Sequence, residues 1–364
     1  MRMFQRLWCG GSILALAGGI VAAQAAPPPP QQQSPPQTRP QPAGPTMLTL
    51  AAVNGATLAG APDAKAAKPA DAIDPVLIRA EVLLDRANFK PGVIDGRMGE
   101  NVANAFSAYA KAHDLPDTRI LSPQLLQALV SADGAPALKA YTITPEDLAG
   151  PWSPEVGENF VKMSEQQSLN YSSAQEMLAA RFHMDPELLK ALNAQADFAK
   201  AGQGLTVVDP GAAALPGPVK RLVVDKASAS VTAFGGDGKV MAVFPATVGS
   251  TERPSPHGTW KIKGVRQNPD YVYDPKKLSW GPKRAGKLHI PPGPKNPVGV
   301  VWIALTARDY GIHGAPDPRL VGKTASHGCV RLTNWDAEEL SKAVKFGVPV
   351  EFVGARGRSR RRAA

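Results

Sequence analysis

The chain has 364 residues, a formal net charge of +10 and two cysteines. Its length excludes a single ordinary hydrophobic core, so we expect two or three domains. Two cysteines allow at most one internal disulfide, and the basic surplus favours an acidic partner such as nucleic acid, an anionic membrane surface or an acidic polymer.

Residues 1–25 have the pattern of a secretory signal peptide. Arg2 and Arg6 precede an apolar run that ends in small residues, with a cleavage site after Ala25. We therefore expect an exported protein, in the periplasm of a Gram-negative type of cell. The alternative is an uncleaved anchor helix, although the run is short for a membrane span. No later stretch is long and apolar enough to span a bilayer, so no transmembrane anchor is expected after cleavage.

Removal of the signal peptide would also remove Cys9 and leave Cys329 as the single thiol of the mature protein. A lone cysteine cannot form an internal disulfide, and in an oxidising compartment an exposed thiol is readily oxidised. Cys329 is therefore expected to be either functional or buried and inert.

The next part of the chain passes from a tether into a helical domain. Residues 26–72 are rich in proline, glutamine and alanine, a composition that predicts disorder. Residues 73–133 predict a small three-helix domain, because apolar residues recur at helical spacing. Its helices are expected from Asp74-Pro75, over Glu100–His113 and from Ser122-Pro123. Residues 134–167 are expected to form a linker.

Residues 168–210 predict a unit of one strand, two helices and a second strand. Ser173 and Glu176 form a capping-box pattern at the start of the first helix. The strands are expected near Tyr171 and in GLTVV. A second linker, residues 211–218, follows.

Residues 219–354 change in character to β structure. Several segments are rich in β-branched and aromatic residues, and GGDG between two of them has hairpin chemistry. Residues 268–297 contain too many prolines and glycines for regular structure, and so long a loop is usually functional. One helix follows the cysteine, with Asn334 or Asp336 near its N-cap, and residues 355–364 form a basic tail.

The stretch ASHGCVRLTN places Cys329 close to His327, and His313 lies upstream in YGIHGAP. A thiol must lose its proton to attack a carbonyl, and a nearby imidazole is the usual base. We expect the Cys329 sulfur to face a ring nitrogen of His313, with a backbone carbonyl near Gly314 holding the other nitrogen. Gly328 frees the backbone to present N–H groups as an oxyanion hole. A thiol pKa near the ordinary value of about 8.5 would count against activation of Cys329.

Three other interpretations stay open at this point. His313 can be an ordinary loop or core histidine, and Cys329 can be buried and inert. His313, His327 and Cys329 can also ligate zinc, because side chains two apart on an extended segment point the same way. Against zinc, no carboxylate general base accompanies the set.

The segment IHGAPDPRLVGKTASHGCVRLTNWDAEEL resembles the signature of the L,D-transpeptidase (YkuD-type) catalytic domain, in which His-Gly and a spacer precede Ser-His-Gly-Cys-x-Arg. The resemblance extends back through ATVGSTERPSPHGTWKI and covers the whole C-terminal domain, with Ser255 at a position that is usually threonine. It implies a mainly β domain with a mixed sheet of sandwich or barrel-like form. It also implies cysteine-dependent acyl transfer without a metal or cofactor, and acylation by carbapenems.

The resemblance further implies a role for individual residues. Cys329 would be the nucleophile, His313 the general base and later acid, and Gly314 the source of the carbonyl that orients His313. The oxyanion hole and donor pocket would be shaped by Ser326, His327 and Gly328. Contacts with the substrate are expected from Arg331, Tyr271, Tyr273 and His289.

The two N-terminal units also resemble known modules. Residues 73–133, with FKPGVIDGRMGE, are similar to the type-1 peptidoglycan-binding domain, and residues 168–210 are a degenerate match to a LysM module. The chain is therefore expected to be a multidomain α and β protein of the cell wall. Its implied partners are the stem peptides and glycan of peptidoglycan, and no nucleic acid.

The implied reaction releases D-alanine from a peptidoglycan tetrapeptide stem and forms a thioester on Cys329. The acceptor is left open: another stem gives a 3-3 crosslink, and a wall-anchored lipoprotein or a free D-amino acid can also serve. Two alternatives are a hydrolase that uses the same site on stems or wall-bound lipoprotein, and a non-catalytic peptidoglycan-binding protein.

Overall fold

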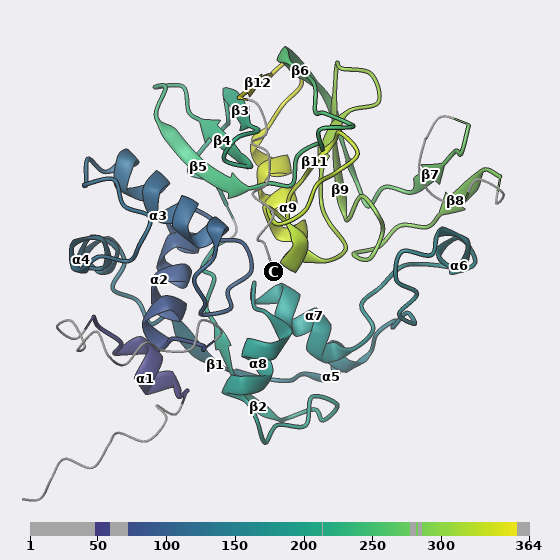
Figure 1. Cartoon of the computed structure of the whole chain (residues 1–364). Helices are drawn as coiled ribbons and strands as arrows, with labels where there is room; N and C mark the ends of the chain where they lie inside the picture. The colour runs from purple at the N-terminus through teal and green to yellow at the C-terminus, as the bar shows by residue number, and fades with distance from the viewer. Residues whose placement is uncertain (1–47, 59–71, 213, 277–281, 283–285, 355–364) are drawn as a thin grey trace, which may run out of the picture. The chain divides into compact units, whose positions relative to one another are not determined.

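The computed structural model of the chain (Figure 1) describes residues 48–58, 72–212, 214–276, 282 and 286–354. These residues belong to the unit Thr46–Ala364. The expected signal peptide and basic tail lie outside the described residues, as does most of the expected tether. In the part of the chain that is described, no helix has the length and apolar character needed to cross a membrane.

The described part of the expected tether contains a helix, α1 (Leu50–Asn54), so the prediction of disorder is wrong for these residues. Thr49 caps the helix with its hydroxyl. Val53 is fully buried in a core shared with later elements. The Asn54 amide exchanges two hydrogen bonds with the backbone of Leu138. These contacts with distant residues order the segment, and its composition gave no sign of them.

Three helices follow where their N-caps predicted them. They are α2 (Pro75–Arg86), α3 (Glu100–Ala112) and α4 (Pro123–Ala132). Asp74 and Ser122 each accept a hydrogen bond from a first-turn N–H, and a proline follows each cap. The apolar faces of the three helices pack into one core around Phe106 and Tyr109.

The second unit has two strands and two longer helices, but its first strand is not where the sequence predicted it. Strand β1 (Leu138–Thr142) pairs antiparallel with β2 (Gly204–Val208), whereas Tyr171 lies in no strand. The segment 134–167, expected to be a linker, therefore contains a strand and two short helices. The helices between β1 and β2 are α5 (Pro145–Leu148), α6 (Phe160–Ser164), α7 (Ala174–Arg181) and α8 (Pro186–Leu192).

The predicted capping box of α7 is only half formed. The Ser173 hydroxyl accepts a hydrogen bond from the Glu176 N–H, as expected. The Glu176 carboxylate instead accepts hydrogen bonds from the N–H and hydroxyl of Ser172, and it pairs with Lys295 at 2.6 Å. Glu176 thus connects α7 to the C-terminal domain.

The C-terminal domain is built on an eight-stranded sheet in the order β11-β10-β9-β6-β12-β3-β4-β5. The strands are β3 (Arg221–Asp225), β4 (Ser230–Phe234), β5 (Val240–Pro245), β6 (Gly258–Gln267), β9 (Val301–Leu305), β10 (Gly311–His313), β11 (Val330–Arg331) and β12 (Pro349–Val353). The β10–β11 and β12–β3 pairs are parallel and the other pairs are antiparallel, which confirms the prediction of a mixed sheet. One core takes side chains from both ends of this sheet and from α9 (Asn334–Ala343), which lies beside the strands in Figure 1.

One local prediction in this domain is confirmed and one is wrong. Asn334 and Asp336 lie in the first turn of α9, next to its N-cap Thr333, whose hydroxyl accepts a hydrogen bond from the Asp336 N–H. The stretch 268–297 contains a regular antiparallel hairpin, because Tyr271, Val272 and Tyr273 pair with a second short strand across its proline-rich middle. The two strands are β7 (Tyr271–Tyr273) and β8 (Leu288–Ile290), and residues 277–281 and 283–285 between them lie outside the described residues.

A buried charged cluster joins α9 to the N-terminal helices. Lys90 pairs with Glu339 of α9 at 2.9 Å and with Asp85 at 3.5 Å. The Nδ1 atom of His183 lies 2.9 Å from the same Asp85 carboxylate. The side chains of Lys90, Asp85 and Glu339 are each at most 4% exposed. The expected independent domains therefore share an interior, and their packing fixes the surroundings of α9.

Candidate active site

The parallel pairing of β10 with β11 brings the expected nucleophile and base to one face of the sheet. His313 pairs with Arg331, so Cys329, two residues before Arg331, is level with Gly311. Side chains alternate along a strand, and residues opposite each other on paired strands share a face. The register therefore places Cys329 and His313 on the same face, and Gly311 adds no side chain between them.

His313 is 3% exposed, and its Nδ1 lies 2.7 Å from the carbonyl oxygen of Gly314. A carbonyl oxygen only accepts hydrogen bonds, so Nδ1 carries the proton of the neutral ring and Nε2 is the basic nitrogen. Burial and the nearby charge of Arg331 lower the pKa of His313 to about 3. The Trp302 ring stacks on the imidazole, with a centroid distance of 5.3 Å. The ring is thus neutral near pH 7 and fixed in orientation.

Cys329 is half-buried, and its sulfur lies 3.8 Å from the carbonyl oxygen of Asp309. Burial raises the pKa of the Cys329 thiol by more than the Gly311 N–H and the charge of Arg331 lower it. The resting group is therefore a thiol, and by the criterion set from the sequence the raised pKa counts against activation of Cys329 in the resting protein. Its proton must leave during the attack, and a neutral imidazole is a suitable acceptor.

The segment between Ser326 and Cys329 is held by two buried hydroxyl groups. The Ser326 hydroxyl donates to the Cys329 carbonyl oxygen at 2.5 Å and accepts from the Gly328 N–H at 3.1 Å. The Ser255 hydroxyl donates to the Gly328 carbonyl oxygen at 2.7 Å and accepts from the Gly249 N–H at 2.9 Å. The Gly328 N–H is therefore engaged by Ser326 in this structure. Ser326 is buried and positions the backbone of the nucleophile.

Arg331 and Tyr271 lie near the thiol. Arg331 follows Cys329 on the same face of β11, and its Nε is buried without a hydrogen-bond partner among the described residues. Burial lowers the pKa of Arg331. Burial and the proximity of Cys329 raise the pKa of Tyr271 to about 12. Both side chains lie close enough to Cys329 for the charges to interact.

The other expected contact residues lie differently. Tyr273 is fully buried in an apolar core, so the prediction that it touches the substrate is wrong for this structure. His289 pairs with Val272 on β8, which places it on the hairpin face opposite Tyr271, and it is exposed. His327 is exposed, and partial burial together with the charge of Arg331 lowers its pKa.

The zinc interpretation finds no site in the residues that the structure describes. Among them, no group of three histidine, cysteine, aspartate or glutamate side chains is placed to hold a metal ion. Cys329 is of intermediate exposure, so it is less buried than a residue of the hydrophobic core.

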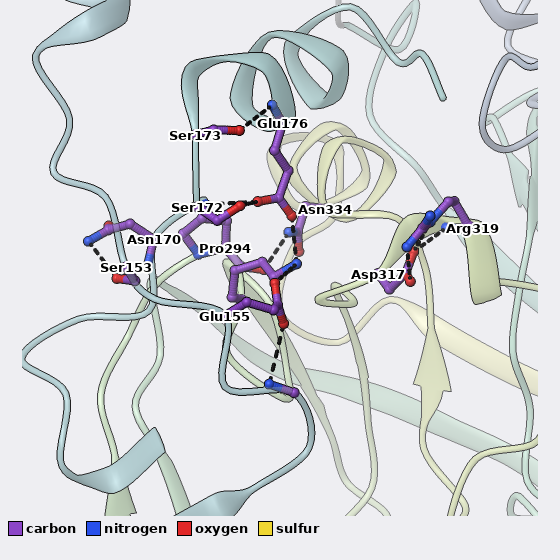
Figure 2. A network of polar contacts seen from close by, with 12 residues as sticks. Ser153, Glu155, Asn170, Ser172, Ser173, Glu176, Pro294, Asp317, Arg319 and Asn334 are labelled. Atoms are coloured by element: carbon purple, nitrogen blue, oxygen red, sulfur yellow. Dashed lines mark hydrogen bonds and ion pairs between the residues drawn. The ribbon is translucent and has the colours of Figure 1, made fainter. Parts of the chain in front are cut away.

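Three positioning residues were missed from the sequence. Ser255 was noted only as a departure at a turn, and nothing in the local pattern marked Trp302 or Asn334. The Asn334 amide donates to the carbonyl oxygen of Pro294 at 3.0 Å (Figure 2). A Cβ atom on Gly314 would lie 2.2 Å from Asn334 Oδ1, so the amide packs against the residue whose carbonyl orients His313.

The C-terminal domain is similar to one family of known proteins. Residues 219–352 match the model of the L,D-transpeptidase catalytic domain. The chain is 25% identical over 177 residues to YkuD of Bacillus licheniformis, which is named as an L,D-transpeptidase, covering 49% of this chain and 92% of that protein. It is 29% identical over 185 residues to the probable L,D-transpeptidase ErfK/SrfK of Escherichia coli K12, covering 49% of this chain and 58% of that protein. A solved structure of L,D-transpeptidase 3 from Mycobacterium tuberculosis aligns with a TM-score of 0.31 and 20% identity, over 42% of this chain and 74% of that one.

Proposed function

We propose that the chain is a cysteine-dependent L,D-transpeptidase that acts on peptidoglycan tetrapeptide stems. The observation that carries this proposal is the hydrogen bond from His313 Nδ1 to the Gly314 carbonyl, on a strand whose parallel neighbour directly follows Cys329. It leaves Nε2 as the base on the face that carries the thiol. The match of residues 219–352 to the L,D-transpeptidase catalytic domain supports the same conclusion.

The first step is acylation of Cys329. The sulfur attacks the carbonyl carbon of the third stem residue while its proton passes to His313 Nε2. The imidazolium then gives this proton to the amide nitrogen of D-alanine as the carbon–nitrogen bond breaks. D-alanine leaves, and a thioester joins the stem to Cys329.

The second step returns the enzyme to its resting state. The amine of an acceptor gives a proton to His313 Nε2 and attacks the thioester carbon. The carbon–sulfur bond breaks, the new amide bond forms, and the proton passes from His313 to the sulfur. A neutral resting pair suits both steps, because the same nitrogen must accept and donate within one cycle.

The expected acceptor is the side-chain amine of a second stem, which gives a 3-3 crosslink. Water at the same position would make the protein a carboxypeptidase. The net charge of +10 favours substrates rich in carboxylates, although screening by salt makes this attraction unspecific.

The test is mass spectrometry of muropeptides after incubation of tetrapeptide stems with the wild type and with Cys329→Ala. We expect 3-3 dimers and free D-alanine from the wild type and neither product from the variant. Tripeptides without dimers would identify a hydrolase instead. Identical product profiles for the two proteins would refute catalysis by Cys329.

A further inference from the structure

Residues 315–325, here called the connecting loop, join the proposed base to the segment of the proposed nucleophile. The loop begins directly after His313-Gly314 and ends before Ser326, whose hydroxyl donates to the Cys329 carbonyl oxygen at 2.5 Å. Because the loop is bonded to both segments, its freedom of movement bears on how precisely the thiol and the imidazole face each other. Small errors in such an alignment slow a reaction strongly.

The first half of the connecting loop is ordered by contacts of its own. Pro318–Leu320 form one turn of 3-10 helix, and the Asp317 carboxylate accepts a hydrogen bond from the Arg319 N–H at 3.0 Å. The same carboxylate pairs with the Arg319 guanidinium at 2.8 Å, as Figure 2 shows. These contacts lie within the loop, so they fix its local shape but not its place on the domain.

Thr247 holds the second half of the loop from within the C-terminal domain. Its hydroxyl donates to the Leu320 carbonyl oxygen at 3.3 Å and accepts from the Gly322 N–H at 2.9 Å. The backbone of Thr247 exchanges two hydrogen bonds of 2.9 Å with Arg331, on the strand that directly follows Cys329. The loop is therefore connected to the strand of the nucleophile through Thr247.

Asn101, on helix α3 of the N-terminal part, holds the same stretch of the loop. Its side-chain amide donates to the Val321 carbonyl oxygen at 2.9 Å, and the residue is 8% exposed. A Cβ atom on Gly322 would lie 2.2 Å from Asn101 Oδ1, so the amide packs directly on the loop backbone. The φ of Gly322 is +76°, a conformation that glycine adopts without strain. Thr247 and Asn101 thus bind three consecutive residues of the loop, 320–322.

Helix α3 has further contacts with the C-terminal domain that do not involve the loop. Asn104, also on α3, donates from its amide to the Ser228 carbonyl oxygen at 3.2 Å. Just before the helix, the Lys90 N–H donates to the Val243 carbonyl oxygen and the Val243 N–H donates to the Asn88 carbonyl oxygen, both at 2.8 Å. Val243 of β5 also packs against the core of the three helices. These contacts should keep the helix in place when its contact with the loop is lost.

We propose that Asn101 is a positioning residue for the acylation of Cys329, because it holds the connecting loop and thereby the alignment of base and nucleophile. The inference rests on the proposed function, since the quantity that it concerns is the rate of acylation. Asn101 lies outside residues 219–352, which match the catalytic domain, so the helical part contributes to the chemistry of the site. It acts through the loop, so its loss should lower kcat and leave KM nearly unchanged.

The experiment compares Asn101→Leu with its matched control, Asn104→Leu, in the full chain. Each substitution removes an amide that joins α3 to a backbone carbonyl of the C-terminal domain, in the connecting loop for Asn101 and in the β3–β4 turn for Asn104. The measurements are kcat and KM for acylation by a tetrapeptide stem, and amide hydrogen exchange of residues 318–324.

We expect Asn101→Leu to speed exchange in the loop and to lower kcat about three- to tenfold, the effect of one hydrogen bond. KM should stay within about twofold of the wild-type value, because binding of the stem is not what changes. Asn104→Leu should match the wild type in loop exchange and in kcat. If Asn101→Leu does not fold, Asn101→Ala and Asn104→Ala give the same comparison without adding atoms.

A purely structural role for Asn101 gives a different result. It would lower the free energy of unfolding, measured by urea denaturation, and leave the kcat of the folded protein as in the wild type. Wild-type kcat or wild-type loop exchange in Asn101→Leu, or an equal loss of kcat in Asn104→Leu, would overturn the inference. Failure of the stem to acylate the wild type would instead refute the proposed function and the catalytic part of the inference with it, whereas faster exchange in Asn101→Leu would still establish that Asn101 holds the loop.

Discussion

At the scale of single residues, the proposed site is a pair of uncharged groups, the His313 imidazole and the Cys329 thiol. Hydrogen bonds fix the orientation of their surroundings. The Gly314 carbonyl selects the tautomer of His313, and the stacked Trp302 ring restricts its rotation. Cys329 keeps its proton because burial raises the pKa of its thiol. If Cys329 is the nucleophile, as proposed, its proton is removed during the attack rather than beforehand.

The low pKa of His313 predicts how the rate of Cys329 acylation depends on pH below neutrality. The base is protonated only near pH 3, so the rate of Cys329 acylation should stay level as the pH falls from about 7 to about 5. An ordinary imidazole would instead lose half of the rate near pH 6.5. The pre-steady-state rate of acylation by a tetrapeptide stem is measured between pH 4 and 8. A midpoint known to about one pKa unit distinguishes the two profiles. Half-maximal acylation near pH 6.5 would contradict the buried, neutral base.

Ser255 predicts a second result at this scale. Its buried hydroxyl bridges the Gly249 N–H and the Gly328 carbonyl, so Ser255→Ala removes a hydrogen bond from each of these two backbone groups. The free energy of unfolding should fall by about 1–3 kcal/mol, and acylation of Cys329 should slow. Chemical denaturation and the acylation rate measure the two effects.

Ser255→Thr is the control for that substitution, because it keeps the hydroxyl. It should retain most of the stability and of the acylation rate. If Ser255→Ala behaves as the wild type, or if both variants lose the same amount, the hydroxyl bridge is not what holds the backbone of the nucleophile.

At the scale of elements, α9 depends on charges supplied by the N-terminal helices. Lys90 offsets the buried Glu339 of α9 and Asp85 of α2. Burial alone would lower the pKa of Lys90, but these two carboxylates raise it. Burial also raises the pKa of Asp336, at the start of α9, to about 7. The helix that follows the nucleophile is thus held partly by residues far from it in the sequence.

Lys90→Met tests this dependence. Removal of one member of a buried ion pair leaves the others uncompensated, and we expect a loss of about 3–5 kcal/mol in the free energy of unfolding. Lys111→Met is the control, because its ion pair with Asp117 is exposed on both sides and should contribute little to the free energy of unfolding. Equal losses in the two variants, measured by urea denaturation, would show that the cluster does not stabilise the fold.

The elements that sequence reasoning predicted well are those with local signals. The helices after Asp74, Ser122 and Ser173 begin at side chains that satisfy the first-turn N–H groups, and such caps are readable from the sequence. The proposal of a Cys329–His313 pair also rests on local signals, because both residues stand in short, distinctive motifs.

The features that were missed depend on distant partners. β1 is a short strand whose partner, β2, lies about sixty residues later, and α1 is ordered by contacts with Leu138. Residues 153–171 were not predicted to be a folded loop, because their apolar residues are few. These residues pack on a hairpin that lies more than a hundred residues later in the sequence. Tyr273 was expected at the surface because nothing in its neighbourhood of prolines and glycines indicates that Phe160 covers it.

At the scale of the whole molecule, the expected separate modules pack against one another in the described residues. Ile78 and Ile94 of the helical part pack in one core with β1 and β2, and Lys90 reaches α9. Residues 153–158 line a cavity together with Arg331. The N-terminal half therefore bears on the environment of the proposed nucleophile as well as on any binding to the cell wall.

The central claim is that Cys329 is acylated by a tetrapeptide stem with loss of D-alanine. Intact-protein mass spectrometry of the full chain after brief exposure to the stem tests it most directly. We expect the wild type to gain the mass of the stem minus D-alanine, on the peptide that contains Cys329, and Cys329→Ala to gain nothing. No adduct on the wild type, or the same adduct on Cys329→Ala, would contradict the account.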